Sequence, residues 1–385
     1  MAQMTIVADD LTGAADSAAP FALAGYATYV ALDQQRLPQA DVLALSTGSR
    51  HLPAERAYDV VRQAVSGLPE RKWLYKKIDS TLRGQPAAEL AALMAAGERT
   101  RALVAPAFPA QQRTTVAGRQ LVGGHPLEQT PFARQVFSSD LLEHFPTARL
   151  IDLEAVWEGV PAVVARLEEE EAGIWVADAE TDDDLQTLAR AAIAGRIDVA
   201  CGSGGLARAL SALKSFPSAS CPVDVGHARG PVLVVAGSRH PASTAQVETL
   251  RLDGAAVISP RSALEPAVAA LRAGHTVVLA CHDDGRRANS KGYARDLAMA
   301  VMRVASATSI GGLVVTGGDT ANVVCKALGA QGIWLRAELE PGIPLGVLAG
   351  ARASGLAIAT KAGGFGDAAA LRRMVSALTG EAAGV

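Results

Sequence analysis

Residues 5–16 read Thr-Ile-Val-Ala-Asp-Asp-Leu-Thr-Gly-Ala-Ala-Asp. The first four are of the apolar and β-branched kinds that form buried strands, and an Ala-rich helical pattern runs over 12–24. A strand that leads directly into a helix is the repeating unit of a wound α/β sheet. This stretch therefore predicts an α/β fold, with two carboxylates at the carboxyl end of its first strand.

The same alternation recurs along the first half of the chain. Short runs of branched apolar residues end in Gly, Asp or Ser, and Ala/Leu-rich segments with helical spacing separate several of them. The predicted strands are 26–32, 42–46, 73–78, 102–105, 174–177 and 199–202, and the predicted helices are 54–65, 87–96 and 182–194.

A stretch rich in Pro, Ser and Gly between Leu213 and Gly230 interrupts this pattern and predicts a linker. Beyond it the predicted strands are 232–236, 256–258, 276–280, 313–316, 333–335 and 356–359, and the predicted helices are 241–252, 263–273, 294–307 and 320–328. We therefore expect two α/β domains with mainly parallel sheets, 1–220 and 226–385, and an interdomain cleft. Each domain can then hold one of two substrates.

Composition excludes several classes of protein. At about 150 residues per domain, 385 residues correspond to two or three domains. A net charge of -3 disfavours a general nucleic-acid binder, and 49% hydrophobic residues indicate a large core and are compatible with a buried homodimer surface. No apolar stretch is long enough to span a membrane, and Asp9 and Asp10 fall where a signal peptide needs apolar residues. We expect a cytoplasmic protein with no membrane partner.

The cysteines favour no metal or disulfide site. The chain contains no Cys-x-x-Cys pair, and its thiols are widely spaced, so buried free thiols are the better interpretation. The four positions are Cys201, Cys221, Cys281 and Cys325.

Asp9 and Asp10 are the first candidates for chemistry. Open α/β sheets bind ligands at the carboxyl ends of their strands, where a carboxylate can accept a substrate hydroxyl and take up its proton. The alternative is that Asp10 or Thr12 only caps the helix that follows, which is common. From these residues alone, both interpretations stay open.

A second polar cluster, Lys76-Lys77-Ile78-Asp79-Ser80-Thr81-Leu82-Arg83-Gly84, follows another predicted strand. The planar guanidinium of Arg83 suits a carboxylate, the hydroxyls of Ser80 and Thr81 suit an anion or a sugar oxygen, and Asp79 suits a hydroxyl proton. Arg50, after strand 42–46, would bring a second guanidinium to the same edge of the sheet. The alternatives are an exposed charged loop and an exposed arginine.

In the second half, residues 314–321 read Val-Val-Thr-Gly-Gly-Asp-Thr-Ala, a strand followed by two glycines, an acid and a helix. Such a turn lets backbone N–H groups and a helix N-terminus approach a phosphate. Similar turns occur at 202–205, 236–240 and 360–367, and Lys361 in the last could pair with a phosphate. Tight packing explains any single one of them equally well, but several together favour a nucleotide site.

Other familiar motifs are missing from the sequence. It contains no G-x-x-x-x-G-K-[ST], no G-x-G-x-x-G at the first helix, no H-E-x-x-H and no G-x-S-x-G. A cation site at His282-Asp283-Asp284 is disfavoured, because three adjacent residues rarely complete a metal shell. We assign no metal ligands.

Taken together, these motifs resemble the four-carbon acid sugar kinases, which phosphorylate threonate or erythronate with ATP. The resemblance spans nearly the whole chain. Its specific motifs are 8–14 (Ala-Asp-Asp-Leu-Thr-Gly-Ala), 77–84 (Lys-Ile-Asp-Ser-Thr-Leu-Arg-Gly), 317–320 (Gly-Gly-Asp-Thr) and 361–366 (Lys-Ala-Gly-Gly-Phe-Gly). The segment that begins at Ala107-Phe108-Pro109 and continues through Arg113-Thr114-Thr115 is also similar to the family.

The resemblance implies an N-terminal acid-sugar domain and a C-terminal nucleotide domain. Together with the residues, it assigns the sugar acid to Asp9, Asp10, Arg50, Lys77, Asp79, Ser80, Thr81, Leu82 and Arg83. It assigns ATP to Ser238, Gly317, Gly318, Asp319, Thr320, Lys361, Gly363 and Gly364. After Ser238, Arg239-His240-Pro241 departs from the small polar residues usual in the family.

The expected reaction is in-line transfer of the γ-phosphoryl group from Mg-ATP to a terminal hydroxyl. Arg83 and Arg50 would hold the substrate carboxylate, and Asp10 or Asp79 would accept the hydroxyl proton. The catalytic candidates are therefore Asp10, Asp79 and Arg83. Two alternatives stay open: a non-catalytic sugar-acid sensor or carrier, which would not need the Gly-rich turns, and an oxidoreductase, which would need a ribose-binding acid that is not evident after Ile258.

Overall fold

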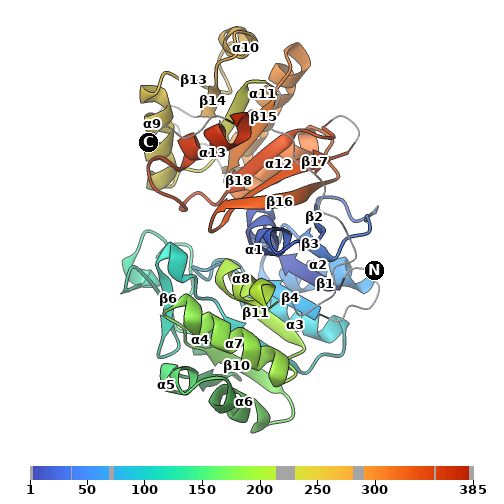
Figure 1. Ribbon diagram of the computed structural model, residues 1–385, viewed down its shortest axis with the longest axis vertical. Coiled ribbons are helices and arrows are strands. Elements are labelled where there is room, and N and C mark those ends of the chain that lie inside the picture. Colours follow the sequence, from blue (N-terminus) through green and yellow to red (C-terminus); the bar gives the residue numbers. More distant parts are fainter. Residues whose placement is uncertain are drawn as a thin grey trace. The chain divides into compact units, whose positions relative to one another are not determined.

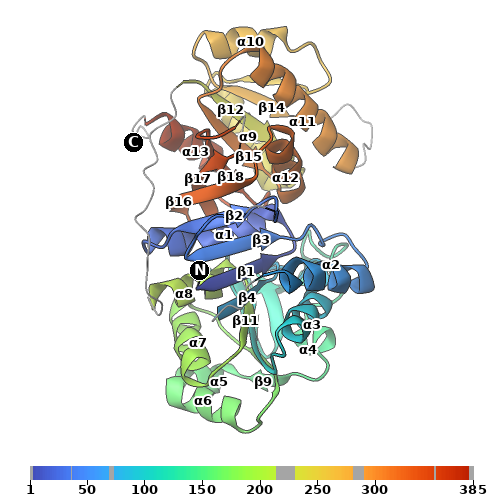
Figure 2. The same ribbon diagram turned by 90° about the vertical axis from the view of Figure 1, so that its right-hand side faces the viewer.

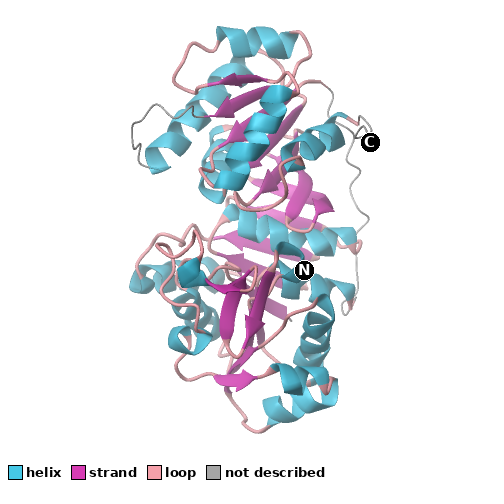
Figure 3. Cartoon of the chain, turned by 90° about the vertical axis from the view of Figure 1, so that its left-hand side faces the viewer, coloured by secondary structure: helices cyan, strands magenta, loops and turns pink. Residues whose placement is uncertain are grey.

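A computed structural model describes residues 3–35, 37–68, 73–213, 230–280, 290–350 and 353–380. Its internal contacts divide the chain into two compact units, one of residues 1–28 and 39–220 and the other of residues 29–38 and 221–385. Figure 1 labels their helices and strands. Both units are α/β, with strands flanked by helices (Figure 3), so the predicted fold class is confirmed. Most of the predicted linker lies outside the described residues.

The first unit is built on a parallel sheet. Its strand order is β3-β1-β4-β11-β5-β10-β9, and every neighbouring pair is parallel. The bounds are β1 Met4–Ala8, β3 Val42–Ser46, β4 Trp73–Lys77, β5 Arg101–Ala105, β9 Arg149–Ile151, β10 Gly173–Ala177 and β11 Val199–Gly202. Central strands such as β1 and β11 are buried on both faces, so their sequences are continuous runs of mainly apolar residues rather than alternating ones. The central strand β4 differs, because it ends in the buried Lys76 and Lys77.

Helices cover both faces of this sheet, as Figure 2 shows. One layer contains α1 (Leu11–Leu23), α8 (Gly204–Ala212), α7 (Asp182–Ala194) and α6 (Val160–Glu168), each packed on the next. On the other face α2 (Ala54–Ser66) packs against α3 (Pro86–Ala96). The unit also contains α4 (Leu141–His144), α5 (Leu153–Trp157), two short 3-10 helices at Pro109–Gln111 and Leu127–Gln129, and a small sheet of β6 (Arg113–Val116), β7 (Arg119–Val122) and β8 (His125–Pro126).

The second unit has a mixed sheet in the order β13-β14-β12-β15-β18-β17-β16. The strands are β12 Val232–Ala236, β13 Ala256–Ile258, β14 Val277–Ala280, β15 Gly312–Thr316, β16 Gly332–Glu340, β17 Ile343–Ala349 and β18 Ala357–Lys361. The first five in the spatial order are parallel, whereas β17 is antiparallel to both β18 and β16. The helices are α9 Pro241–Leu252, α10 Glu265–Arg272, α11 Ser290–Ala307, α12 Gly318–Ala327 and α13 Ala370–Thr379.

A short N-terminal segment belongs to this second unit. Residues 29–38, which include most of β2 (Thr28–Ala31), group with it rather than with the residues around them in sequence. The Tyr29 ring lies 4.9 Å from the Trp334 ring, and the N–H groups of Leu32 and Asp33 donate to the carbonyl oxygen of Gln331. Gly332 leaves room for this ring, because a Cβ there would lie 2.2 Å from it.

Each predicted strand and helix coincides with one in the structure, with ends that differ by a few residues. The pattern did not predict β9, β17, α4, α5, α8 or α13, nor the small sheet β6-β7-β8. Within the described residues, no helix has both the length and the apolar character needed to cross a membrane. Cys201 and Cys325 are buried free thiols, as expected.

Candidate functional site

The ends of three neighbouring strands in the first unit bring together carboxylates and a guanidinium. Asp9 and Asp10 follow β1, Arg50 follows β3, and Asp79 follows β4. Arg50 Nε and Nη2 donate to the two carboxylate oxygens of Asp9 at 2.7 and 2.8 Å, and Arg50 Nη1 donates to Asp10 Oδ2 at 2.6 Å. Arg50 Nη2 also lies 3.7 Å from Asp79 Oδ1. The interpretation of Arg50 as an exposed arginine is therefore wrong, since its side chain is 11% exposed.

Arg83 forms the second guanidinium contact of this site. Its Nε and Nη2 donate to Asp79 Oδ2 and Oδ1 at 2.7 and 2.9 Å, and the Thr81 hydroxyl donates to the same carboxylate. Leu82 between them has φ +56°, a backbone conformation that residues with a side chain rarely adopt. The Ser80 carbonyl accepts from Gln120 Nε2 at 2.8 Å. Side chain and backbone therefore hold the 79–83 turn in one shape.

Charge pairing dominates the acidity of these carboxyls. Burial alone would raise the pKa of Asp79, but the Arg83 and Arg50 guanidiniums outweigh it and hold this pKa well below its usual range. Burial would likewise raise the pKa of Asp9, and Arg50 lowers it. Both groups are therefore ionised at neutral pH, and Asp79 in particular is a weak proton acceptor.

Asp10 has two structural roles at once. Its Oδ1 accepts from the Gly13 N–H at 2.7 Å, which makes it the N-cap of α1, and its Oδ2 accepts from the Thr12 hydroxyl at 3.0 Å and from Arg50. The capping interpretation is thus confirmed. Capping does not exclude a role in chemistry, because the same carboxylate lies in the cluster at the strand ends.

Lys77 faces the opposite side of β4 from its neighbour Lys76. Lys77 Nζ lies 3.8 Å from Asp16 Oδ1 on α1, and both side chains are almost fully buried. Gly13 admits this lysine, since a Cβ there would lie 3.1 Å from Lys77 Nζ and 2.7 Å from Asp10 Oδ1. The first turn of α1 therefore packs directly against the charged cluster.

The second unit brings its Gly-rich turns together in the same way. The parallel strands β12, β15 and β18 are neighbours, and each ends in one of these turns. The Gly317 N–H donates to the Lys361 carbonyl at 3.0 Å, and the Gly237 N–H donates to the Thr316 carbonyl at 3.2 Å. The predicted residues Ser238, 317–320 and 361–364 therefore lie at one edge of this sheet.

Glycine is required at several of these positions. A Cβ at Gly363 would lie 1.9 Å from Ser238 Oγ, and a Cβ at Gly237 would lie 1.9 Å from Thr320 Oγ1. Gly317 has φ +93° and precedes α12, whose first N–H groups have no acceptor within the helix. Close turns around a helix N-terminus suit an anion such as a phosphate.

The turn at 202–205 does not belong to this group. It lies in the first unit, where Ser203 caps α8 by accepting from the Gly205 N–H and its hydroxyl donates to the Ala107 carbonyl at 2.7 Å. A Cβ at Gly205 would lie 2.5 Å from that carbonyl oxygen. Tight packing accounts for these glycines, so the prediction that groups them with the Gly-rich turns of the second unit is wrong.

Lys361 is a buried lysine beside the Gly-rich turns of the second unit. Its side chain is fully buried, and its Nζ lies 3.4 Å from the Gly363 carbonyl oxygen, a long hydrogen bond. Burial lowers the pKa of Lys361 to about 7. A phosphate close to this amine would favour the charged form and raise the pKa again.

We expect ATP binding to take up a proton at Lys361. At about one pH unit above the free-state pKa, most of the lysine is neutral, so binding of a phosphate should draw up to about one proton per site from the buffer. Calorimetry in two buffers of different ionisation enthalpy measures this uptake. Lys361→Met should abolish it, whereas Lys326→Met, at an exposed lysine in α12, should not. Equal uptake in parent and Lys361→Met would contradict the assignment.

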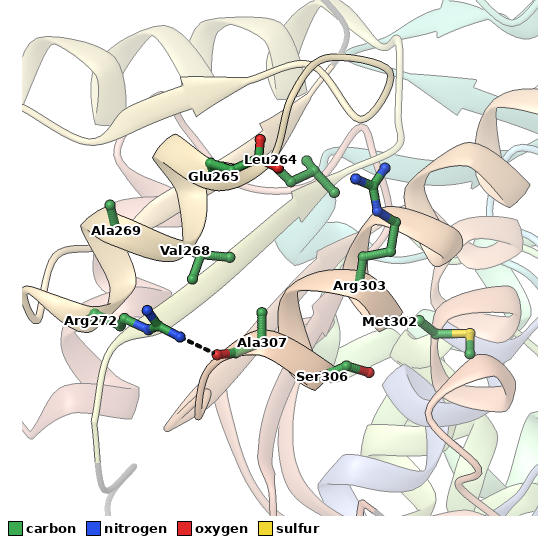
Figure 4. A pocket seen from close by; sticks show the side chains of 9 residues that line it. All are labelled: Leu264, Glu265, Val268, Ala269, Arg272, Met302, Arg303, Ser306 and Ala307. Carbon is green, nitrogen blue, oxygen red and sulfur yellow. Dashed lines mark hydrogen bonds between the residues drawn. The ribbon is translucent and has the colours of Figure 1, made fainter.

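A separate groove lies between α10 and α11 (Figure 4). It has a volume of about 600 Å³, and the Arg272 guanidinium in it donates to the Ala307 carbonyl at 2.8 Å. Its lining residues are Leu264, Glu265, Val268, Ala269, Arg272, Met302, Arg303, Ser306 and Ala307. It contains none of the strand-end residues and is not part of either cluster described above.

Four residues that lie next to the acid cluster were not assigned to the site from the sequence: Asp16, Glu89, Arg113 and Gln120. Glu89 is 1% exposed in α3, where its neighbours are Ala and Leu; a lone acid in an apolar helix was the available signal. Burial lowers the pKa of Arg113 to about 10, and Asp79 and Arg83 also act on it. No sequence signal separates Asp16 or Gln120 from ordinary polar residues.

No cluster of three or more His, Cys, Asp or Glu suited to a metal ion occurs in the part of the chain that is described. The segment His282-Asp283-Asp284 lies outside that part. Mg²⁺ that arrives on a nucleotide does not need such a cluster, because it is commonly held by phosphate oxygens, waters and one or two carboxylates. Asp319 lies in the first turn of α12.

Comparisons with known proteins identify the two halves of the chain. Residues 4–210 match the family model of a sugar-binding N-terminal domain, and residues 233–371 match that of a nucleotide-binding C-terminal domain. The chain is 39% identical to a D-threonate kinase of Bordetella bronchiseptica, covering 97% of this chain and 96% of the relative. It is 32% identical to a D-erythronate kinase of Heliobacterium modesticaldum, covering 95% of each.

Solved structures share the fold. A protein of Haemophilus influenzae matches with a TM-score of 0.72 at 20% identity, covering 96% of this chain and 98% of that one. A Bordetella bronchiseptica protein, described as a domain swapped dimer with bound citrate, matches at 36% identity with a TM-score of 0.51, covering 98% of each chain.

Proposed function

The chain belongs to the four-carbon acid sugar kinase family, and on that premise we propose that it transfers the γ-phosphoryl group of ATP to a terminal hydroxyl of a four-carbon sugar acid. The observation that carries the proposal is the cluster of Asp9, Asp10 and Asp79 with two guanidiniums at the strand ends of the sugar-binding unit. Carboxylates suit the hydroxyls of such an acid, and guanidiniums suit its carboxylate. D-threonate is the first acid to test, because it names the more similar of the two relatives.

Arg83 is the residue best placed to hold the substrate carboxylate. Two of its nitrogens pair with Asp79, its guanidinium lies 5.6 Å from the centroid of the Phe132 ring, and its side chain is 26% exposed. Arg50 uses Nε, Nη1 and Nη2 on Asp9 and Asp10. We assign to Arg50 the orientation of these two carboxylates toward the substrate hydroxyls.

Asp10 is the proposed proton acceptor. Asp79 contacts two arginines, and Asp9 forms a bidentate hydrogen bond with Arg50. Asp10 accepts from only one guanidinium N–H among the hydrogen bonds of the described cluster. A base within hydrogen-bond reach of the acceptor hydroxyl would take its proton as the new P–O bond forms and the bond to ADP breaks.

In the second unit, the turns at Ser238, 317–320 and 361–364 would hold the phosphates of ATP. Backbone N–H groups of the α12 N-terminus and the Lys361 amine would contact phosphate oxygens. Mg²⁺ bound to those phosphates would neutralise part of their charge. Asp319 would hold the ion.

We also propose a homodimer. The support is the related Bordetella bronchiseptica protein, which is described as a domain swapped dimer. Light scattering of the purified protein tests this, since the chain has a mass of 39.6 kDa and a dimer twice that mass.

Release of ADP by the purified protein with Mg-ATP tests the proposed function. The panel contains D- and L-threonate, D- and L-erythronate and longer sugar acids, because motifs do not encode stereochemistry. We expect turnover confined to one or two four-carbon acids, with D-threonate among them. Calorimetric binding of an acid without any ADP release would instead favour a sensor or carrier, which needs no nucleotide site.

A further inference from the structure

A buried ion pair lies directly beneath the charged cluster of the first unit. Lys76 Nζ is 2.7 Å from Glu89 Oε2, and the two side chains are 0% and 1% exposed. Lys76 and Lys77 are consecutive in β4, so their side chains point to opposite faces of the sheet. Lys77 faces α1 and Asp16, whereas Lys76 faces α3. The two lysines therefore have separate roles.

The ion pair connects the ends of β1 and β4. Lys76 Nζ donates to the Lys77 carbonyl at 2.6 Å and to the Val7 carbonyl at 3.2 Å. Val7 and Lys76 are partners in the register of these two strands. In the sequence, Asp9 lies two residues after Val7, and Asp79 lies two residues after Lys77. One ammonium group thus fixes the backbone just before both carboxylates.

Glu89, the acidic partner of Lys76, is hydrogen-bonded to the segment that contains Arg50. Glu89 Oε1 accepts from the Ser49 hydroxyl at 2.6 Å, and Ser49 Oγ lies 2.7 Å from Thr47 Oγ1. The Thr47 hydroxyl in turn donates to the Ala8 carbonyl at 2.9 Å. Ser49 is the residue before Arg50, so the network closes a loop through all three strand ends.

Stability alone is a poor explanation for such a pair. Removing two charges from water costs free energy that their attraction often does not repay, and a well-packed apolar pair of similar volume is frequently as stable. Accurate placement of reacting groups is a better explanation, because a displacement of about 1 Å can lower the rate about a hundredfold. A fully buried charged network that ends one or two residues from each functional side chain is suited to that task.

We propose that Lys76, Glu89 and Ser49 are positioning residues of the sugar-acid site, an inference that rests on the proposed function. They hold Asp9, Arg50 and Asp79 in register without touching the substrate. Loss of the network leaves the fold intact and displaces the three charged side chains relative to one another.

The test is the double variant Lys76→Met/Glu89→Leu, which replaces the pair by apolar side chains of similar length. We expect a thermal midpoint close to that of the parent, an unchanged KM for ATP, and a fall in turnover of the acid of about tenfold or more. A folded double variant with turnover within about twofold of the parent would overturn the proposal.

Ser49→Ala provides the second variant, should the double variant not fold. It removes one hydrogen bond at the edge of the network and should lower turnover about threefold at an unchanged melting temperature; an unchanged turnover would also overturn the proposal. Asp198→Ala is the matched control. Asp198 accepts from the N–H groups of Thr100 and Arg101 at the other end of the same sheet, so its loss should lower stability without changing turnover.

The experiment distinguishes failure of the proposed kinase function from failure of the proposed positioning role. If the parent releases no ADP with any acid, that function fails whatever the variants do. The positioning role is then read from the dissociation constant of the acid by calorimetry, with a loss of about tenfold in the double variant as the expected result and no loss as the contrary one.

Discussion

Asp10→Asn should lower turnover of the sugar acid by about 10²–10⁴, the usual loss when a general base is removed. The amide cannot accept the hydroxyl proton, but asparagine is as good an N-cap as aspartate, so the bond from the Gly13 N–H to the side chain can survive. The fold of α1 should therefore persist. Steady-state kinetics with saturating ATP, together with a thermal melt, separate lost chemistry from lost structure.

Two further variants are measured beside Asp10→Asn. Asp79→Asn tests the other candidate base, and Asp152→Asn is the control. Asp79 is a weak base because Arg83 and Arg50 hold its pKa well below its usual range, although burial acts in the opposite direction, so its loss should act mainly on the KM for the acid. Asp152 caps α5 by accepting from the Ala155 N–H at 3.0 Å, and Asp152→Asn should be silent. If Asp79→Asn lost the rate and Asp10→Asn stayed within about threefold of the parent, Asp79 would be the base instead.

Gly363→Ala should raise the KM for ATP about ten- to a hundredfold. The new methyl group would lie 1.9 Å from Ser238 Oγ and 2.6 Å from Ser238 Cβ, so the turn after β12 must move away from the turn after β18. Overpacking of this kind costs about 1–3 kcal/mol, which corresponds to that range of affinity. ATP titrations by kinetics or calorimetry measure the effect.

The same variant should leave binding of the sugar acid unchanged, because its assigned residues lie in the other unit. Gly67→Ala is the matched control: Gly67 has φ −93°, and no atom lies within 4 Å of a Cβ built there. An ATP KM equal to that of the parent in Gly363→Ala would show that the contact between these turns is not part of the nucleotide site.

Most of the parallel strands were predictable because burial on both faces makes them runs of mainly apolar residues. The edge strand β9 has only three residues, one of them buried, and was not predicted. Strands β16 and β17 form an antiparallel pair in the second unit, with partly buried residues alternating along β17 and with Pro344 and Gly346 inside it. Such a strand lacks the continuous run. Helix α13, in contrast, places the buried residues Leu371, Met374 and Leu378 on one face, a pattern that sequence analysis could have recognised.

The chemistry at the strand ends was predictable for a topological reason. Parallel neighbours end at the same edge, so polar residues after β1, β3 and β4 must meet there. The pairing of charges was not predictable, because which carboxylate Arg50 contacts depends on rotamers and on the φ +93° of Gly84, where a Cβ would lie 3.0 Å from Asp9 Oδ2. The pairing of Glu89 was not predicted either, although a lone acid in an apolar helix was a signal, because its partner Lys76 comes from another element.

Identification of the product tests the central claim most directly. Phosphorus and carbon NMR of the parent protein with D-threonate and Mg-ATP should show ADP and one new phosphate ester in equal amounts, with the ester at the terminal carbon of the acid. ADP accompanied only by inorganic phosphate, or an ester at another carbon, would contradict the account.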